Sequence, residues 1–401
     1  VLTVAIPLLL FATGEGEVTE PTVPTTVAPT TTAATTTTAA PTSTTAAPTT
    51  TTTIVEVVVP PAPEISWTRL PDQPAFDGAE IGGWGAAITK GGPGLMAVGQ
   101  AFSETGDRYA AMFVSVDGET WERVDEPFVE AGRFGILWDV AAGPDGTLVA
   151  VGSDDTDAGV WVSSDGYAWS KVEADVLGGS DVQSMVGVAA GGPGFVAVGR
   201  DGSNAGVWVS PDGFEWTKIE DEALVSGGRP LLIEDVVASG PGLVAVGSSG
   251  FELESDVDGA AWVSRNGYVW ERLPGDTFAA ESGDTGLQSL TVHPASGRII
   301  AWGSEMWTAT DGYHWVATER DMPFGGPPAG AEVAWNGNTA VAAGLDAAFS
   351  LWVTGDAGAN WTRVAPVEPE FDDFNDQAVA VARFDGEWVV AGSGADGGVI
   401  W

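Results

Sequence analysis

The sequence predicts an all-β fold built from repeated four-stranded units, and three observations support this prediction. The 401-residue chain contains 55 glycines and 18 tryptophans, which suits short strands and tight turns because glycine weakens helices. A short turn that ends in tryptophan recurs six times, at a period of about 48 residues. The segments before these turns include runs such as Phe195–Gly199, apolar at nearly every position, which indicates strands buried on both faces.

Each unit is predicted to form four strands, called a, b, c and d in chain order. In the third unit these are Val186–Ala190, Phe195–Gly199, Gly206–Ser210 and a strand that begins at the turn tryptophan, Trp216–Ile219. The six turns join c to d, are called Trp turns below, and occupy 115–121, 163–169, 210–216, 264–270, 309–315 and 354–361. Repeats of this length with this strand content are typical of propeller blades.

The two ends of the repeat region predict the number of blades. Strands a to d occur in order six times between Trp84 and Pro366, and a, b and c follow once more at Gln377–Ala382, Glu387–Gly392 and Gly398–Trp401. The missing d strand is expected at Ile65–Leu70. The sequence therefore predicts a seven-bladed β-propeller of four-stranded antiparallel blades. An N-terminal strand completes the last blade, and this closure removes free sheet edges.

The first 63 residues are expected to lie outside this fold. Residues 1–14 begin with an apolar run that is too short to span a membrane, and they fit a signal peptide or the remnant of a membrane anchor. Residues 15–63 are rich in Thr, Pro and Ala and predict a disordered stalk in front of the propeller at 64–401. We therefore expect an exported protein, secreted or held at a bacterial-type cell surface, which contacts the membrane only through an uncleaved anchor.

Charge and cysteine content restrict the partners. The chain has 15 Lys and Arg against 56 Asp and Glu, and the formal net charge of −41 argues against nucleic acid. A chain without cysteine has no disulfide, thiolate metal site or cysteine nucleophile. We expect a monomer whose ligand is a carbohydrate or a protein, cationic or bridged to the acidic surface by calcium.

The Trp turns resemble the Asp-box (BNR) repeat, whose pattern is Ser/Thr-x-Asp-x-Gly-x-x-Trp. The residues that carry the resemblance are Ser115, Asp117, Gly118, Trp121, Ser163, Asp165, Gly166, Trp169, Ser210, Asp212, Gly213, Trp216, Ser264, Asn266, Gly267, Trp270, Asp311, Gly312, Trp315, Thr354, Asp356, Gly358 and Trp361. Only the last turn has the full spacing; the other five are one residue shorter, and Ala309 replaces the serine in the fifth. The chain from 64 to 401 is similar to Asp-box propellers, among them sialidases, xyloglucan-cleaving glycosidases, sortilin-type receptors and photosystem II assembly factors. In these families the repeat lies on the face opposite the ligand site, so the resemblance implies a fold and no particular activity.

Each Trp turn is expected to hold its hairpin together. The Asp or Asn side chain accepts backbone N–H groups, the glycine supplies a positive φ, and the tryptophan (Trp67 by analogy in the last blade) packs between blades. A second aromatic series precedes the turns at Phe113, Trp161, Trp208, Trp262, Trp307 and Trp352. Because the series repeats from blade to blade, we expect core residues; stacking on carbohydrate is the alternative.

The candidate catalytic residues are mostly acidic. The resemblance to sialidases implies a site with three arginines and a tyrosine nucleophile, and Tyr109 is the only tyrosine outside the Trp turns. A glycosidase that uses two carboxylates is the stronger alternative. Its candidates are Asp139, Asp235 and Glu332, which are expected at the start of inner strands facing the channel, and Asp376 in a loop. The competing interpretation is a solvated acidic face that keeps an exported protein soluble.

Calcium is the cation that the sequence suggests, although the fold requires no cofactor. Asp256 with Asp258, and Asp372 with Asp373, place oxygen ligands close together, without the full spacing of an EF-hand. Zinc catalysis is not expected, because His293 and His314 are the only histidines and form no ligand pair.

These observations predict a binding or scaffold module that acts through the inter-blade loops of an acidic face. One alternative is a glycoside hydrolase or lyase, sialidase-like or of the two-carboxylate type, with carboxylates near the channel mouth. Another is an extracytoplasmic assembly factor.

Overall fold

The structure is a computed structural model of the chain. It describes residues 63–401 except 82–85, 103–107, 125–134, 241, 251–256, 279–284, 304, 319–331, 346–348, 365–376 and 395–396. The chain divides into two compact units, Val1–Val57 and Val58–Trp401, and every described residue belongs to the second. Within these described ranges, no helix has the length and apolar character needed to cross a membrane.

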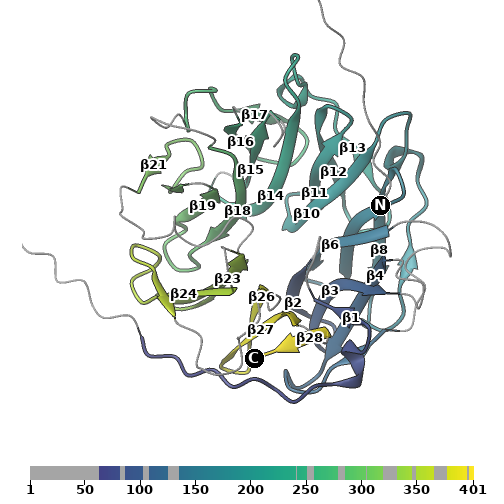
Figure 1. Cartoon of the computed structure of the whole chain (residues 1–401). Coiled ribbons are helices and arrows are strands. Elements are labelled where there is room, and N and C mark those ends of the chain that lie inside the picture. Colours follow the sequence, from purple (N-terminus) through teal and green to yellow (C-terminus); the bar gives the residue numbers. More distant parts are fainter. Residues whose placement is uncertain are drawn as a thin grey trace, which may run out of the picture. The chain divides into compact units, whose positions relative to one another are not determined.

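The second unit is an all-β ring of seven antiparallel sheets, the blades of a propeller (Figure 1). Blades 2 to 6 each contain four strands, and each strand pairs with the next along the chain. Blade 2 contains β6 (Gly135–Ala142), β7 (Leu148–Asp154), β8 (Asp157–Ser163) and β9 (Ser170–Lys171). Blade 3 contains β10 (Gln183–Gly191), β11 (Gly194–Asp201), β12 (Asn204–Ser210) and β13 (Thr217–Lys218). Blade 4 contains β14 (Leu231–Ser239), β15 (Gly242–Ser249), β16 (Asp258–Ser264) and β17 (Trp270–Arg272). Blade 5 contains β18 (Leu287–Val292), β19 (Ile299–Gly303), β20 (Met306–Ala309) and β21 (Val316–Ala317). Blade 6 contains β22 (Glu332–Asn336), β23 (Thr339–Leu345), β24 (Phe349–Thr354) and β25 (Thr362–Val364).

Blades 1 and 7 differ from this pattern. Blade 1 contains β1 (Ala79–Glu80), β2 (Ala87–Gly91), β3 (Gly94–Phe102), β4 (Arg108–Ser115) and β5 (Glu122–Arg123). Both β1 and β2 pair with β3, so they are two parts of one interrupted strand a. Blade 7 contains three strands, β26 (Gln377–Phe384), β27 (Glu387–Gly394) and β28 (Gly397–Ile400). Three short 3-10 helices precede strand a of blades 1, 3 and 4, namely η1 (Pro74–Phe76), η2 (Asp175–Leu177) and η3 (Glu222–Leu224).

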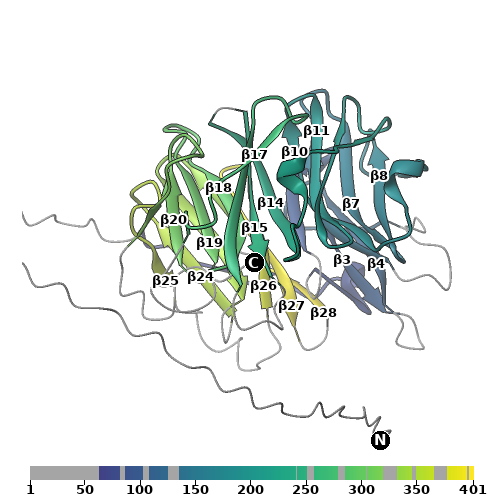
Figure 2. The ribbon, with the colours of Figure 1, turned by 90° about the horizontal axis from the view of Figure 1, so that it is seen from above.

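Strand a is the innermost strand of each blade. Neighbouring a strands contact one another around the ring, and β26 of blade 7 contacts β2 of blade 1, which completes the circle. Figure 2 shows the strands running between the two faces of this unit. Because successive strands are antiparallel, the a–b turns and the Trp turns lie on one face, called the Trp-turn face. The b–c and d–a connections lie on the opposite face, called the loop face.

The ring closes where the sequence predicts. The backbone N–H of Leu70 donates to the carbonyl of Ile400 at 2.9 Å. The same bond joins Leu273 to Ala261 in blade 4, and Leu70 stands three residues after Trp67 as Leu273 does after Trp270. Ile65 and Trp67 pack against Val399 and Trp401 in one apolar cluster.

The closing segment is not a regular strand, in contrast to the prediction for 65–70. No strand is assigned to it; the d strands of the other blades are themselves only two or three residues long, so the loss of a single bridging pair is enough to leave none. The seventh blade therefore consists of three strands and an irregular fourth edge.

The second aromatic series forms the interface between blades. Trp161, Trp208 and Trp262 are each at most 2% exposed. The indole N–H of Trp208 donates to the carbonyl of Val176 in η2, and that of Trp262 donates to Ala223 in η3, each at 2.9 Å. The prediction of core residues is thus confirmed.

Replacing Trp208 with alanine should lower the free energy of unfolding by about 3–5 kcal/mol, because the change removes a fully buried indole and leaves a cavity between two blades. Trp208→Phe keeps most of the apolar contact and should cost clearly less. Urea denaturation followed by circular dichroism measures both. Equal losses for the two variants would show that the lost hydrogen bond to Val176, and not the cavity, dominates.

Candidate functional site

Seven residues occupy equivalent positions on the seven innermost strands. Each pairs with the strand-b residue that directly precedes a glycine of that strand, and in five blades a β-bulge immediately precedes the position. The seven residues are Ala87, Asp139, Gly187, Asp235, Ser289, Glu332 and Ala380. Acidic residues therefore occupy this ring in blades 2, 4 and 6, and small residues occupy it in the other four. The three acids are called the carboxylate ring below.

The two aspartates of the carboxylate ring each connect two blades. Oδ1 of Asp139 accepts the N–H of the next residue at 2.6 Å, and Oδ2 accepts the N–H of Val188 in blade 3 at 2.8 Å. Asp235 repeats this arrangement, with the next N–H at 2.6 Å and the N–H of Leu290 in blade 5 at 2.6 Å. Val188 and Leu290 directly follow Gly187 and Ser289, so the small residues expose the backbone that the acids bind.

Glu332 reaches further than the aspartates. Its Oε2 accepts the N–H of Val381 in blade 7 at 3.3 Å, and its carboxylate also accepts the N–H of Ile88 in blade 1. The longer side chain therefore connects blades 6, 7 and 1. These bonds lie at the inner edge of blade 7, whose own inner position is Ala380.

Burial raises the pKa of all three acids. The pKa is raised to about 6 for Asp139 and to about 8 for Asp235, and it lies well above its usual value for Glu332. Desolvation is the largest cause in each case, and the backbone hydrogen bonds oppose it. The charge of Asp139 raises the pKa of the other two further. The side chains keep some accessible surface, but the surrounding inner strands desolvate the carboxyl groups.

A carboxyl group with a raised pKa is a candidate general acid. In the carboxylate ring, however, both oxygens of Asp139 and of Asp235 already accept backbone N–H groups. The shown role of these side chains is therefore to join blade 2 to blade 3 and blade 4 to blade 5. Among the described residues, no group of three or more His, Asp or Glu side chains is arranged to hold a metal ion.

Only some of the remaining candidate residues are described by the structure. Asp256, Asp372, Asp373 and Asp376 lie outside the described residues. The described member of the first calcium pair is Asp258. Its Oδ2 forms an ion pair with Nη1 of Arg229 at a distance of 2.7 Å. Tyr109 lies at the start of β4 on the loop face and is 40% exposed.

The Trp turns are held by a repeated set of hydrogen bonds. In the third turn, Oγ of Ser210 accepts the N–H of Gly213 at 2.8 Å, and Oδ1 of Asp212 accepts the N–H groups of Phe214 and Glu215 at 2.8 and 2.9 Å. The indole N–H of Trp216 donates to the carbonyl of Gly213 at 2.6 Å. Gly213 has a φ of +86° and lies against Val149 of the preceding blade, so no side chain fits there.

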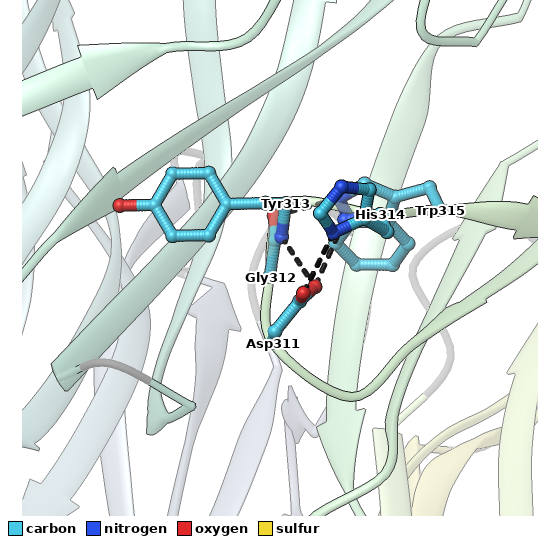
Figure 3. A network of polar contacts seen from close by, with 5 residues as sticks. All are labelled: Asp311, Gly312, Tyr313, His314 and Trp315. Atoms are coloured by element: carbon cyan, nitrogen blue, oxygen red, sulfur yellow. Dashed lines mark hydrogen bonds and ion pairs between the residues drawn. The ribbon is translucent and has the colours of Figure 1, made fainter.

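The fifth turn keeps this arrangement without the serine. Figure 3 shows Asp311 between the backbone of Tyr313 and the side chain of His314, while the Tyr313 ring points away from both. The bond from Nδ1 of His314, 2.7 Å from Oδ2, is the main reason that the pKa of Asp311 falls to about 2. The Asp carboxylate thus supplies the turn contacts where Ala309 lacks a hydroxyl.

The sequence predicts the three acids individually as candidate site residues. Their alternation with small residues around the ring was not predicted. The signal is present in the aligned segments Trp-Asp-Val-Ala-Ala (138–142), Val-Gly-Val-Ala-Ala (186–190) and Glu-Asp-Val-Val-Ala (234–238). Two inter-blade acceptors were also missed. Gln73 and Asp221 accept the backbone N–H of Trp121 and Trp270 at 2.7 and 3.0 Å, each from the loop that precedes strand a.

Seven antiparallel blades arranged in a closed ring define a β-propeller protein. No model of a protein family matches the sequence, and no curated protein matches it. Solved structures do match. YCF48 bound to D1 peptide is 15% identical with a TM-score of 0.51, and the match covers 85% of this chain and 98% of that one. YCF48 from Cyanidioschyzon merolae is 16% identical with a TM-score of 0.53, covering 84% and 98%. Virginiamycin B lyase from Staphylococcus aureus is 10% identical with a TM-score of 0.50, covering 79% and 94%. At these identities the likeness establishes the fold alone.

Proposed function

We propose that this chain is an exported β-propeller that serves as a binding or scaffold module at a bacterial-type cell surface. The apolar run in 1–14 and the Thr/Pro/Ala-rich stalk at 15–63 support export. The proposal includes an identification of the Trp turns as Asp-box repeats. The acceptor pattern of Ser210 and Asp212 supports this identification.

The observation that carries the proposal is the occupation of the carboxylate ring. A two-carboxylate glycosidase needs one carboxyl group as a proton donor and a second as base or nucleophile, both directed at substrate. The oxygens of Asp139 and Asp235 instead bind the backbone of two blades each. Side chains committed to holding the ring together favour a propeller that binds over one that catalyses at its centre.

The loop face supplies the proposed ligand surface. Asp155 and Asp181 are exposed there, beside the b–c turns of blades 2 and 3. The lysines of the same region are already paired: Lys171 lies 2.5 Å from Asp154, and Lys218 pairs with Asp201. The exposed charge is therefore acidic, and it favours a cationic protein segment or a ligand bridged by calcium.

A protein ligand is the first choice between protein and carbohydrate. YCF48, which shares this fold, is described as bound to a D1 peptide, so a propeller of this architecture can present a peptide site. A peptide site would also fit an extracytoplasmic assembly factor as a specific form of the scaffold role.

The test is a binding experiment with peptide and glycan arrays, using the full chain with and without calcium. We expect binding to cationic peptides that falls at least fivefold in Asp155→Asn/Asp181→Asn. A charge-matched variant of the outer d strands, Glu122→Gln/Glu271→Gln, should bind these ligands as the wild type does, because both residues are exposed but lie away from the loop face. No binding on either array in the presence of calcium would reject the proposal.

A glycosidase remains the second candidate because the pKa of Asp235, about 8, is that of a group protonated at neutral pH. Turnover of a panel of polysaccharides and aryl glycosides tests it. Activity that disappears in Asp139→Asn and Asp235→Asn, with unchanged circular dichroism spectra, would decide for the enzyme.

A further inference from the structure

The exposed hydrophobic side chains are concentrated on the face opposite the proposed ligand surface. Nine large hydrophobic side chains are exposed among the described residues, and six of them lie in or directly after Trp turns. These six are Val116, Tyr167, Phe214, Tyr268, Val269 and Val316. The other three, Tyr109, Val182 and Val225, lie on the loop face. An accumulation of this kind on one face is typical of an interaction surface.

Three aromatic residues form the centre of this accumulation. Tyr167, Phe214 and Tyr268 occupy the same position in the Trp turns of blades 2, 3 and 4, directly after the turn glycine, and are 42%, 53% and 48% exposed. They are called the aromatic arc. In blade 5 the equivalent Tyr313 is partly buried against its neighbours, and blades 1 and 6 have Glu119 and Ala359. The arc thus spans three consecutive blades.

The turns themselves do not need these rings. The contribution of each residue to its turn is its backbone N–H, which donates to Oδ1 of Asp165, Asp212 or Asn266 at 2.8–2.9 Å. An exposed ring on a backbone fixed in this way loses little further entropy when a ligand covers it.

The charges beside the arc indicate which partner it fits. Hydrogen bonds from the turn backbone hold the pKa of Asp165 and Asp212 below its usual value, so both carboxylates are ionised beside the first two rings. Glu215 adds a third exposed acidic residue, and Arg265 is the basic residue of the fourth Trp turn. With a net charge of −41, a second copy of this chain or an anionic surface would be repelled.

We propose that the aromatic arc is a docking surface for an extended, arginine- and lysine-rich segment of another protein. A cation is attracted to the face of an aromatic ring, and a carboxylate nearby adds to this attraction. Cation–π contacts of this kind also occur within the chain itself. Arg383 lies over the ring of Trp388 at 4.3 Å, and Arg272 lies over Trp262 at 5.7 Å. The arc presents three rings in succession, which suits an extended segment better than a single small ligand. This surface does not rest on the proposed function, because it uses the other face.

The probe is a fluorescein-labelled peptide of alternating arginine and glycine, titrated with the full chain at physiological salt and followed by anisotropy. The arc variant is Tyr167→Ser/Phe214→Ser/Tyr268→Ser, and the matched control removes the three exposed hydrophobic side chains of the loop face, Tyr109→Ser/Val182→Ser/Val225→Ser. We expect the dissociation constant to rise at least fivefold in the arc variant and to stay within twofold in the control. A peptide with citrulline in place of arginine, which keeps the shape without the charge, should bind at least tenfold more weakly to the wild type.

Protection from hydrogen exchange locates the bound peptide, and it should appear at 164–168, 212–215 and 265–269. Unchanged melting temperatures of the variants show that the turns remain folded. The proposal is overturned if the wild type does not bind the peptide, if the arc variant binds as tightly as the wild type, or if the control loses affinity equally. Arc-dependent binding of a neutral oligosaccharide such as cellohexaose, without peptide binding, would also overturn it and assign the arc to carbohydrate.

Discussion

Removal of residues 64–70 should lower the melting temperature by about 5–10 °C and make unfolding less cooperative. Ile65, Trp67 and Leu70 are partly buried against the first and last blades, and losing them removes roughly 2 kcal/mol of apolar burial for each side chain. The deletion also exposes the edge of β28, where the carbonyl of Ile400 accepts the N–H of Leu70 in the intact protein. Differential scanning calorimetry measures the effect, and light scattering should show association of the exposed edge.

Two further variants separate closure from the length of the N-terminal segment. Deletion of seven residues at 40–46, within the Thr/Pro/Ala-rich segment, should leave the melting temperature unchanged. Leu70→Pro removes the N–H that Ile400 accepts and should destabilise more than Leu70→Ala. Unchanged melting of the 64–70 deletion would show that the ring does not depend on this segment.

The free energy of unfolding should fall as the pH rises from about 5 to about 8, by up to about 1.4 kcal/mol per pH unit for each group that titrates. The folded protein raises the pKa of Asp139 to about 6 and of Asp235 to about 8, both from 3.8. The native state therefore holds these protons at a pH where the unfolded chain has released them, and deprotonation weakens the folded state. The Trp-turn aspartates act in the opposite sense: Asp117, Asp165 and Asp212 have lowered pKa values, and their contribution is lost as the pH falls below about 4. A stability maximum between pH 4 and 5 follows from the two groups together.

The variant Asp235→Asn isolates the contribution of the Asp235 carboxyl group to the dependence of the free energy of unfolding on pH. The amide cannot titrate, so the slope between pH 5 and 8 should become shallower, although the variant is less stable at pH 5 because the amide offers only one acceptor to two N–H groups. Glu215→Gln, at an exposed position, should keep the wild-type slope. Melting temperatures at half-unit pH intervals give the comparison. A wild-type curve that is flat or rises between pH 5 and 8 would contradict the assignment of raised pKa values.

The number of blades, the strand order and the place of closure were predictable because each follows from a repeated local signal. A glycine turn, an apolar run and a terminal tryptophan locate three of the four strands in a blade without reference to the rest of the chain. Strand d was predicted less well at the closure. A strand was expected at Ile65–Leu70, but no strand is assigned there, and the described backbone hydrogen bond to β28 comes from Leu70. The length of that outer strand depends on its pairing with the neighbouring strand, and not on its own apolar pattern.

The role of the carboxylate ring was harder to predict. Asp139, Asp235 and Glu332 are acidic residues of the kind that a two-carboxylate catalytic site uses. Only the three-dimensional register shows that these side chains accept backbone N–H groups of the next blade. Such a bond joins residues about fifty positions apart, because one blade occupies about that length of chain. The acidic loops gave the weakest basis for prediction, since charge alone does not state which carboxylates face a ligand.

Seven is an odd number, and the carboxylate ring divides it unevenly. Asp139 joins blades 2 and 3, Asp235 joins blades 4 and 5, and Glu332 joins blades 6, 7 and 1. The propeller is thus partitioned into two pairs and one triplet, with three seams (between blades 1 and 2, 3 and 4, and 5 and 6) that none of these carboxylates crosses. The non-covalent closure of the ring, between Leu70 and Ile400, lies within blade 7 and therefore inside the triplet, away from all three seams.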